Sequence, residues 1–148
     1  MKRTFLVFAC LLLVLPALVF AQKFPGVTVT VMAHSGHHAV PWHGEAKNIL
    51  DQYGIKLNII EVNPDELYSK EVLELTNRTG AYDIIQYNSA WIGDYEEYIQ
   101  PLDEYVAKDN DAIGFADLLP AFNKAQNLWG GKKMSVTLDG DTEGGAPV

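Results

Sequence analysis

Cysteine is almost absent from this chain of 148 residues, because its single copy, Cys10, lies within the hydrophobic stretch near the N-terminus. The sequence after that stretch therefore excludes intrachain disulfides and thiol catalysis. A domain outside the cytoplasm would then depend on burial of its core alone. That requirement suits a bacterial cell envelope better than a small disulfide-bonded extracellular scaffold.

Positive charge is also scarce. The chain has 11 lysine and arginine residues against 19 aspartate and glutamate residues, which gives a formal net charge of −8. Because nucleic acids and anionic membrane surfaces are bound through concentrated positive charge, neither is expected as a partner. The acidic balance favours solubility and is compatible with neutral or cationic ligands.

The N-terminal segment has the pattern of a secretory signal peptide. Lys2 and Arg3 precede the nearly all-apolar residues 4–20, and a cleavage-site pattern ends at Ala21. We expect cleavage after Ala21 and a periplasmic, extracytoplasmic location. Cleavage leaves 127 residues, enough for one domain with its own core. The formal charge becomes −10, because two positive charges are removed from the −8 of the whole chain.

Two alternatives for this segment fit less well. A retained membrane anchor would need an uninterrupted apolar run, but Pro16 interrupts this one and no stop-transfer charges follow it. A lipoprotein would carry its lipid on Cys10, but most of the apolar stretch follows that residue instead of preceding it.

Three strand patterns alternate with two helix patterns in the first half of the mature chain. Residues 27–33, 56–62 and 82–87 are rich in β-branched and other apolar side chains. Apolar residues at helical spacing predict helices over 45–53 and 63–79. Short connections between these elements favour parallel pairing with right-handed crossovers. The expected fold class is α/β, with a mostly parallel sheet flanked by helices.

The helix boundaries carry local signals. Gly54 occurs where a left-handed residue would end the first helix. Asn63 can cap the second helix and Pro64 fits its first position, while Gly80 is expected to end it. The spacing of apolar residues predicts a buried stripe on this helix, made of Tyr68, Val72 and Leu75.

Patterns in the second half are weaker. A short helix is expected within 88–98, and residues 99–106 lead into another. A strand is expected over 134–138. One further helix, ending near residue 129, is predicted from apolar residues spaced for a single face, namely Leu118, Leu119, Phe122 and Ala125.

Side chains suited to a polar, ring-shaped ligand follow three of the expected strands. Open parallel sheets bind ligands at the C-terminal ends of their strands, which directs attention to 34–44, 88–93 and 139–141. Aromatic faces combined with a few fixed polar groups are what a sugar requires. The candidate stacking residues are Trp42, Tyr87 and Trp91. The candidate hydrogen-bonding residues are His43, Glu45, Asn88, Asp139 and Asp141.

Each group of candidates has an alternative interpretation. Trp42 and Trp91 fit core packing as well as ligand stacking. All four histidines of the chain lie within ten residues, which raises the alternative of a zinc site, although their spacing matches no compact metal motif. The histidines concerned are His34, His37, His38 and His43.

Enzymatic signatures are weak. The chain has no Gly-x-Ser-x-Gly elbow, and Ser35 next to His34 does not define a triad without supporting geometry. Asp139 and Asp141 could be proposed as the acid pair of a glycosidase, but nothing in the sequence shows that the pKa of either carboxyl is perturbed. No catalytic residue is therefore assigned, and we expect a protein without enzymatic activity.

The order of motifs resembles the start of a family 1 extracellular solute-binding protein, the ligand receptor of a sugar-type ABC importer. After the signal segment come the strand at 27–33 and the helices at 45–53 and 63–79. The later motifs are Tyr82-Asp83-Ile84-Ile85-Gln86-Tyr87, Ile99-Gln100-Pro101-Leu102-Asp103, Gly131-Lys132 and Leu138-Asp139-Gly140-Asp141.

The resemblance implies the first lobe of a type II periplasmic-binding-protein-like fold, with the second lobe missing. It divides the chain into a signal peptide (1–21), an N-terminal α/β lobe (22–142) and an off-pattern tail (143–148). It implies a monomer that binds a sugar, oligosaccharide or polyol without a cofactor and delivers it to the membrane permease subunits of an ABC importer. A frameshift, an early stop or a fragmentary gene model would account for the tail, and an inactive fragment stays an alternative.

Overall fold

The computed structural model describes residues 22–109, 112 and 114–138. The expected signal peptide and the tail at 143–148 lie outside these residues, and so do Asp139 and Asp141. Within the described part of the chain, no helix combines the length and the apolar character that crossing a membrane requires.

A three-stranded parallel sheet organises the first half of the chain. Strand β1 (Thr28–His34) lies in the middle, with β2 (Lys56–Val62) on one side and β3 (Ile84–Ile85) on the other. β1 pairs with β2 along its whole length, from Thr28 opposite Lys56 to His34 opposite Val62. β3 pairs with β1 through only two residues. The predicted parallel α/β fold is therefore confirmed, whereas the expected third strand over 82–87 is shorter than predicted.

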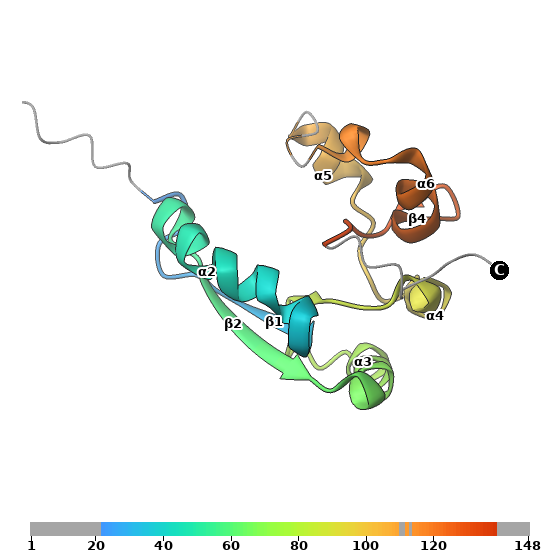
Figure 1. Ribbon diagram of the computed structural model, residues 1–148, viewed down its shortest axis with the longest axis horizontal. Coiled ribbons are helices and arrows are strands. Elements are labelled where there is room, and N and C mark those ends of the chain that lie inside the picture. Colours follow the sequence, from blue (N-terminus) through green and yellow to red (C-terminus); the bar gives the residue numbers. More distant parts are fainter. Residues whose placement is uncertain (1–21, 110–111, 113, 139–148) are drawn as a thin grey trace, which may run out of the picture.

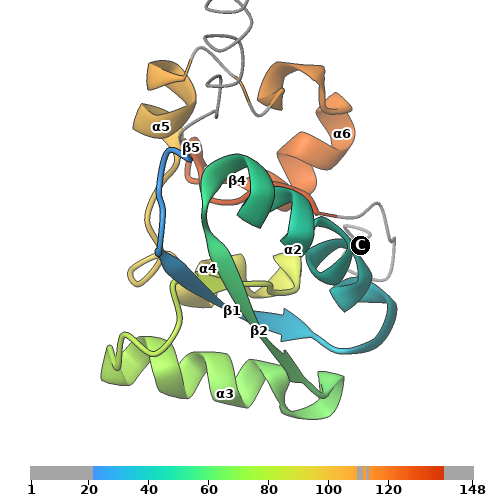
Figure 2. The ribbon, with the colours of Figure 1, turned by 90° about the vertical axis from the view of Figure 1, so that its left-hand side faces the viewer.

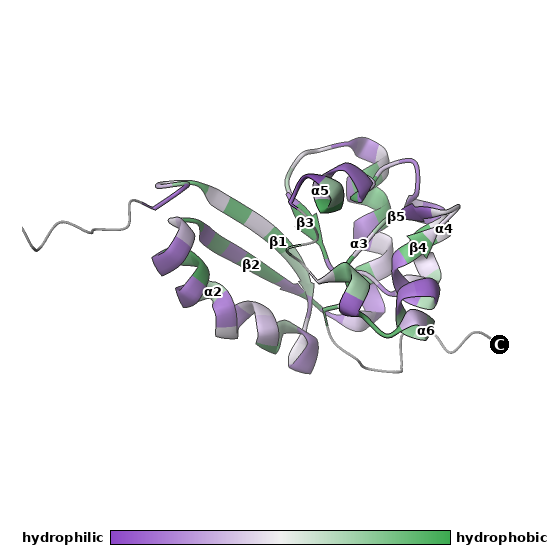
Figure 3. Ribbon diagram, turned by 90° about the horizontal axis from the view of Figure 1, so that it is seen from above, coloured by the Kyte–Doolittle hydropathy of each residue, from purple (hydrophilic) through white to green (hydrophobic). Residues whose placement is uncertain are grey.

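Helices cover the two faces of this sheet. A 3₁₀ turn (Gly36–Ala39) leads into α2 (Val40–Tyr53), which lies along β1 and β2 (Figures 1 and 3). Helix α3 (Pro64–Asn77) runs below the strands in Figure 2. The prediction that the first helix begins at residue 45 is wrong, because the 3₁₀ turn continues directly into α2 and Pro41, with its fixed φ angle, is accepted in the first turn.

Strand β1 supplies both sides of the core, since successive residues of a strand point to opposite faces. Val31 and Ala33 pack with Ala39 on the α2 side, where Trp42 and other half-buried side chains extend the cluster. Met32 packs with Val62 and Leu67 on the α3 side. Because Val31, Met32 and Ala33 have no exposed surface, the carboxyl half of β1 is the centre of the fold.

The start of α3 follows its sequence signals, but its buried face does not. Asn63 caps the helix as predicted, with its side-chain oxygen accepting a hydrogen bond from the backbone N–H of Asp65 at 3.0 Å. The buried residues are Leu67 and Glu71 instead of the predicted apolar stripe, and Tyr68 is 39% exposed. The helix also ends earlier than Gly80, because Arg78 takes the left-handed cap position with φ of 49°.

Short elements make up the second half. They are a 3₁₀ turn (Ser89–Trp91), α4 (Ile92–Tyr95), α5 (Asp103–Lys108), a 3₁₀ turn (Phe115–Asp117), α6 (Pro120–Phe122), a π-helical turn (Asn123–Asn127) and the antiparallel strands β4 (Leu128–Trp129) and β5 (Lys132–Lys133). The strand predicted over 134–138 is wrong, because no described strand pairs with that segment. The predicted helix face is also wrong at Leu119 and Ala125, which are exposed.

Helix α2 ends at Gly54, a left-handed residue in close contact with the segment before β1. Gly54 has φ of +78°, and a β-carbon there would lie 2.9 Å from the backbone of Pro25. We expect Gly54→Ala to lower the free energy of unfolding by about 2–3 kcal/mol, since left-handed strain of about 1–2 kcal/mol is joined by a steric collision. Gly36 has a similar φ of +83° but open space around it.

Gly36→Ala is therefore the matched control, because it introduces the backbone strain without the collision. Urea denaturation of both variants measures the difference. Equal losses of stability would show that the segment before β1 yields to the added methyl group and that the collision contributes nothing.

Candidate functional site

The carboxyl ends of the three parallel strands meet at one edge of the sheet. Backbone hydrogen bonds continue past the strands, from Ser35 N–H to the Val62 carbonyl at 2.9 Å and from Gln86 N–H to the Met32 carbonyl at 2.9 Å. The residues that follow β1 and β3 are therefore held beside each other. Ligands of open parallel sheets bind at this edge.

Gln86 connects the two strand ends through its side chain. Its Oε1 atom accepts hydrogen bonds from the Trp42 indole N–H at 3.0 Å and from the His34 backbone N–H at 3.3 Å. Its Nε2 atom donates to the His38 carbonyl at 3.2 Å. Sequence analysis missed this residue, although a glutamine directly after a short strand has the donor and acceptor needed for such a connection.

Trp42 lies at this edge of the sheet, but its contacts are with other residues of the fold. Its indole N–H bonds to Gln86, and its ring packs against the cluster of Val31, Ala33 and Ala39. Both features match the core-packing alternative, and the half-buried ring still has exposed surface.

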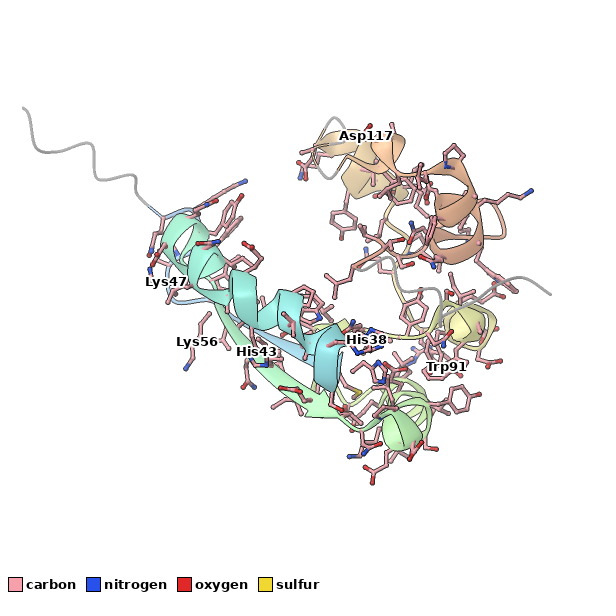
Figure 4. The ribbon with its side chains drawn as sticks, in the orientation of Figure 1. His38, His43, Lys47, Lys56, Trp91 and Asp117 are labelled. Carbon is pink, nitrogen blue, oxygen red and sulfur yellow. The ribbon has the colours of Figure 1, made fainter. Side chains whose placement is uncertain are left out.

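The other two candidates on α2 are exposed and have different partners. His43 Nε2 lies 2.9 Å from Glu61 Oε1 of β2. Glu45 Oε2 accepts a hydrogen bond from Asn48 on the same helix at 2.9 Å. Neither hydrogen-bonds to Gln86, so both lie outside the junction at that residue, although His43 contacts the carboxyl end of β2 through Glu61. Figure 4 shows His38 at the end of the sheet and His43 further along α2, beside β2.

The remaining histidines lie close together, at the end of β1 and in the 3₁₀ turn that follows it. The ring centroids of His34 and His38 are 4.2 Å apart, and those of His37 and His38 are 3.9 Å apart. The first pair is stacked and the second is tilted by 36°, whereas a zinc site requires nitrogen atoms that converge on one point. No group of three or more His, Cys, Asp or Glu side chains in the described part of the chain is arranged to hold a metal ion.

Asn88 and Trp91 lie just beyond β3. Asn88 Oδ1 caps the following turn by accepting a hydrogen bond from the Ala90 N–H at 2.9 Å. Trp91 is half-buried and packs against the cluster of Met32, Val62 and Leu67. Trp91 thus lies on the α3 side of the sheet and Trp42 on the α2 side. Figure 4 shows Trp91 between α3 and α4.

Tyr87 leads from β3 into a buried polar cluster with Glu71 and Tyr95. The Tyr95 hydroxyl donates to Glu71 Oε2 at 2.9 Å, while Glu71 Oε1 has no hydrogen-bond partner among the described residues. The Tyr87 hydroxyl is also unpartnered there: Ser135 lies close, but its hydroxyl donates to Gln126 and Asn127 instead. Sequence analysis missed Glu71 and Tyr95, because a glutamate and a tyrosine in helices carry no signal of burial.

Burial governs the ionisation of this cluster. Glu71 has no exposed surface, and desolvation raises the pKa of its carboxyl to about 8, against a smaller opposing effect of the hydrogen bond from Tyr95. Desolvation also raises the pKa of Tyr87 and Tyr95. The Glu71 carboxyl is therefore mostly protonated and neutral at pH 7.

Tyr68 borders the cluster on its exposed side. Its hydroxyl donates to Asp94 Oδ2 at 3.1 Å, and this hydrogen bond to a carboxylate raises the pKa of Tyr68. Its ring lies 5.1 Å from Trp91 and 6.2 Å from Tyr95. Four aromatic side chains therefore gather between α3, α4 and the segment after β3.

A separate hollow of about 380 Å³ lies between the C-terminal end of α3 and the beginning of β3. Arg78, Tyr82 and Tyr98 are among its lining residues. None of the predicted site residues lines it.

Comparisons with known proteins support the fold. No family model matches the sequence, and no curated protein is similar to it in sequence. An ABC transporter solute-binding protein from Agrobacterium radiobacter K84, solved with ribitol, has a TM-score of 0.70 and 19% identity, over 76% of this chain and 29% of that chain. The maltotriose-binding protein of Thermus thermophilus, bound with maltotriose, has a TM-score of 0.56 and 21% identity, over 73% of this chain and 28% of that chain.

The chain therefore has the fold of part of a solute-binding protein, as predicted. It spans less than a third of the length of either structural neighbour. At these identities the likeness defines the arrangement of helices and strands alone.

Proposed function

We propose that this chain supplies the N-terminal lobe of an extracytoplasmic solute-binding protein that captures a sugar, oligosaccharide or polyol for an ABC importer. The observation that carries the proposal is the junction at Gln86, which holds the ends of β1 and β3 together at the edge where open parallel sheets bind ligands. Both structural neighbours are binding proteins for such ligands, and one contains a polyol and the other an oligosaccharide.

The residues after β3 are the best candidates for ligand contact. Tyr87, Asn88 and Trp91 follow the strand end within six positions and combine aromatic faces with an amide, as a hydroxyl-rich ring requires. We propose that Trp91 supplies the stacking surface and that Asp139 and Asp141, which lie outside the described residues, add hydroxyl acceptors. The exposed His43 and Glu45 would join only if the ligand extends over α2.

The wider role follows from the same proposal. A cleaved signal peptide would place the protein in the periplasm, and delivery of its ligand would require the permease subunits of an importer. Solute-binding folds close two lobes around a ligand, so one lobe alone would make only part of the contacts and bind weakly. We assign the chain no catalytic step.

Titration of the ¹⁵N-labelled chain with maltotriose and with ribitol, followed by NMR, tests this function. We expect saturable shifts at Tyr87, Asn88 and the Trp91 indole, with a dissociation constant of about 1 mM or weaker for a single lobe. Trp91→Ala is expected to weaken binding about threefold to tenfold, because an aromatic contact contributes about 0.5–1.5 kcal/mol.

Tyr53→Ala is the control, since Tyr53 is an exposed aromatic residue at the far end of α2. That variant should bind as the original chain does. Shifts that gather at Arg78 and Tyr98 would assign the ligand to the hollow beside α3 instead. The absence of saturable shifts with either sugar would contradict the proposed ligand class.

A further inference from the structure

We propose that Glu71 and Tyr95 form a positioning pair that holds Tyr87 and Trp91 in place at the sheet edge, an inference that rests on the proposed function. Neither member of the pair is offered as a ligand contact, because both are buried, with 0% and 1% exposed surface. They act through the aromatic rings that they support.

Tyr95 is the point at which these rings meet. Its ring lies edge-on to Tyr87 with centroids 5.4 Å apart, and edge-on to Trp91 with centroids 6.5 Å apart. Edge-to-face packing of this kind depends on the orientation of each ring. A displacement of the Tyr95 ring would therefore be transmitted to both candidate contacts.

The segment that carries Tyr87 and Trp91 has little backbone pairing with the sheet beyond Gln86, although the Trp91 ring also packs against the cluster of Met32, Val62 and Leu67. β3 contributes only two residues to the sheet, and a 3₁₀ turn of three residues follows it. Side-chain packing must therefore fix this segment more than backbone pairing does. Tyr95 supplies part of that packing from α4 and is in ring contact with both Tyr87 and Trp91.

Glu71 fixes Tyr95 in turn. The 2.9 Å hydrogen bond from the Tyr95 hydroxyl to Glu71 Oε2 joins α4 to α3 and sets how deeply the Tyr95 ring lies. A neutral carboxyl can stay in this apolar setting, whereas a carboxylate there has lost its hydration and gains a single hydrogen bond in return.

The surroundings favour the neutral form. The titratable groups near the pair are Tyr87 after β3, Tyr68 on α3 and Asp94 on α4. β1 contributes the apolar Met32 and the segment after β5 contributes the uncharged Ser135. No described lysine or arginine forms an ion pair with Glu71. With a pKa of about 8, the carboxyl ionises just above neutral pH. The hydrogen bond from Tyr95 favours the charged form, but the larger cost of desolvating that charge should displace the Glu71 side chain and change the contact between α3 and α4.

Fluorine NMR of the full chain labelled with 5-fluorotryptophan tests the pair directly. The sequence has three tryptophans, so three resonances are expected, and Trp91→Phe identifies the one of interest. Between about pH 6 and about pH 9.5 the Trp91 resonance should move with a midpoint near 8, while that of Trp42, on the α2 side of the sheet, stays in place.

Conservative variants distinguish an effect on the position of Trp91 from an effect on the stability of the whole chain. Glu71→Gln keeps an acceptor for Tyr95 but cannot ionise, so the Trp91 resonance should stay near its low-pH position at every pH. Tyr95→Phe keeps the ring but loses the hydrogen bond, so the resonance should be displaced at every pH. Glu66→Gln, at an exposed carboxylate of the same helix, should titrate as the original chain does.

A Trp91 resonance that does not move with pH, or that moves equally in Glu71→Gln, would overturn the proposal, and this result does not require Tyr95→Phe to fold. Maltotriose and ribitol titrations at about pH 6.5 and about pH 9 form the second arm, with affinity expected to fall about threefold to tenfold at the higher pH. If neither sugar binds while the resonance titrates as expected, the proposed function fails and the positioning pair stands.

Discussion

Glu71→Gln is expected to raise the free energy of unfolding by about 1–3 kcal/mol at pH 7, which is unusual for removal of a charged residue type. The native chain keeps this carboxyl neutral, because burial raises its pKa from 4.5 to about 8. In the unfolded chain the same group is ionised above about pH 4.5. Folding at neutral pH must therefore take up a proton, whereas glutamine needs none.

The direction of the pH dependence follows from the proton balance. The folded state holds more protons than the unfolded state between the two pKa values, so the contribution of Glu71 to stability is greatest below pH 4.5 and falls as the pH rises to about 8. The slope approaches about 1.4 kcal/mol per pH unit, and above pH 8 the loss is constant. Burial of the glutamine amide cancels part of the gain. The expected increase in the free energy of unfolding at pH 7 is therefore smaller than the shift in pKa alone would give.

Urea denaturation of both proteins at several values between about pH 5 and about pH 9 measures this difference. The stability gap should widen with pH. Glu66→Gln is the matched control, because Glu66 is exposed and pairs with Lys70 one turn along the same helix, and its effect should stay within about 0.5 kcal/mol. A gap that does not change with pH would show that Glu71 is ionised in the folded chain.

Gln86→Ala is expected to lower the free energy of unfolding by about 2–4 kcal/mol. The change removes three hydrogen bonds, to the indole of Trp42, the backbone N–H of His34 and the carbonyl of His38. A partly buried donor left without a partner costs more than the net value of the bond that held it. The segment after β1 should also lose its connection to β3.

Gln100→Ala is the control for this variant. Gln100 also donates a side-chain hydrogen bond, to the Tyr105 hydroxyl at 2.9 Å, but both residues are exposed. Water can replace that bond, so a loss of less than about 1 kcal/mol is expected. Thermal and urea denaturation compare the two, and an equally small effect of Gln86→Ala would mean that water takes over its three partners as well.

The elements with strong local signals were predictable from sequence. β2 has the predicted limits, and the Asn63 cap and the left-handed Gly54 occur as expected. Each depends on residues adjacent in the chain. Such elements can therefore be predicted without reference to the tertiary structure.

The predictions from sequence fail where contacts with residues far along the chain determine the structure. Residues 134–138 resemble a strand in composition but meet no described strand to pair with. The buried face of α3 passes through Glu71 because Tyr95, far along the chain, contacts it there. Gln86 was overlooked for the same reason, since its three partners lie far away in the sequence, at the end of β1 and in the turn and helix that follow it. The general position of the candidate site followed from strand order, whereas its internal contacts did not.

The position of β2 has a consequence for the behaviour of the chain at high concentration. β2 is at the border of the three-stranded sheet, so its backbone groups on the far side face no further strand among the described residues. An edge strand of this kind can pair with strands of other molecules and so begin aggregation. Lys56 and Glu61 are exposed at the two ends of this strand, and their opposite charges would have to be dehydrated by an incoming strand. The two charged residues thus act as gatekeepers against self-association.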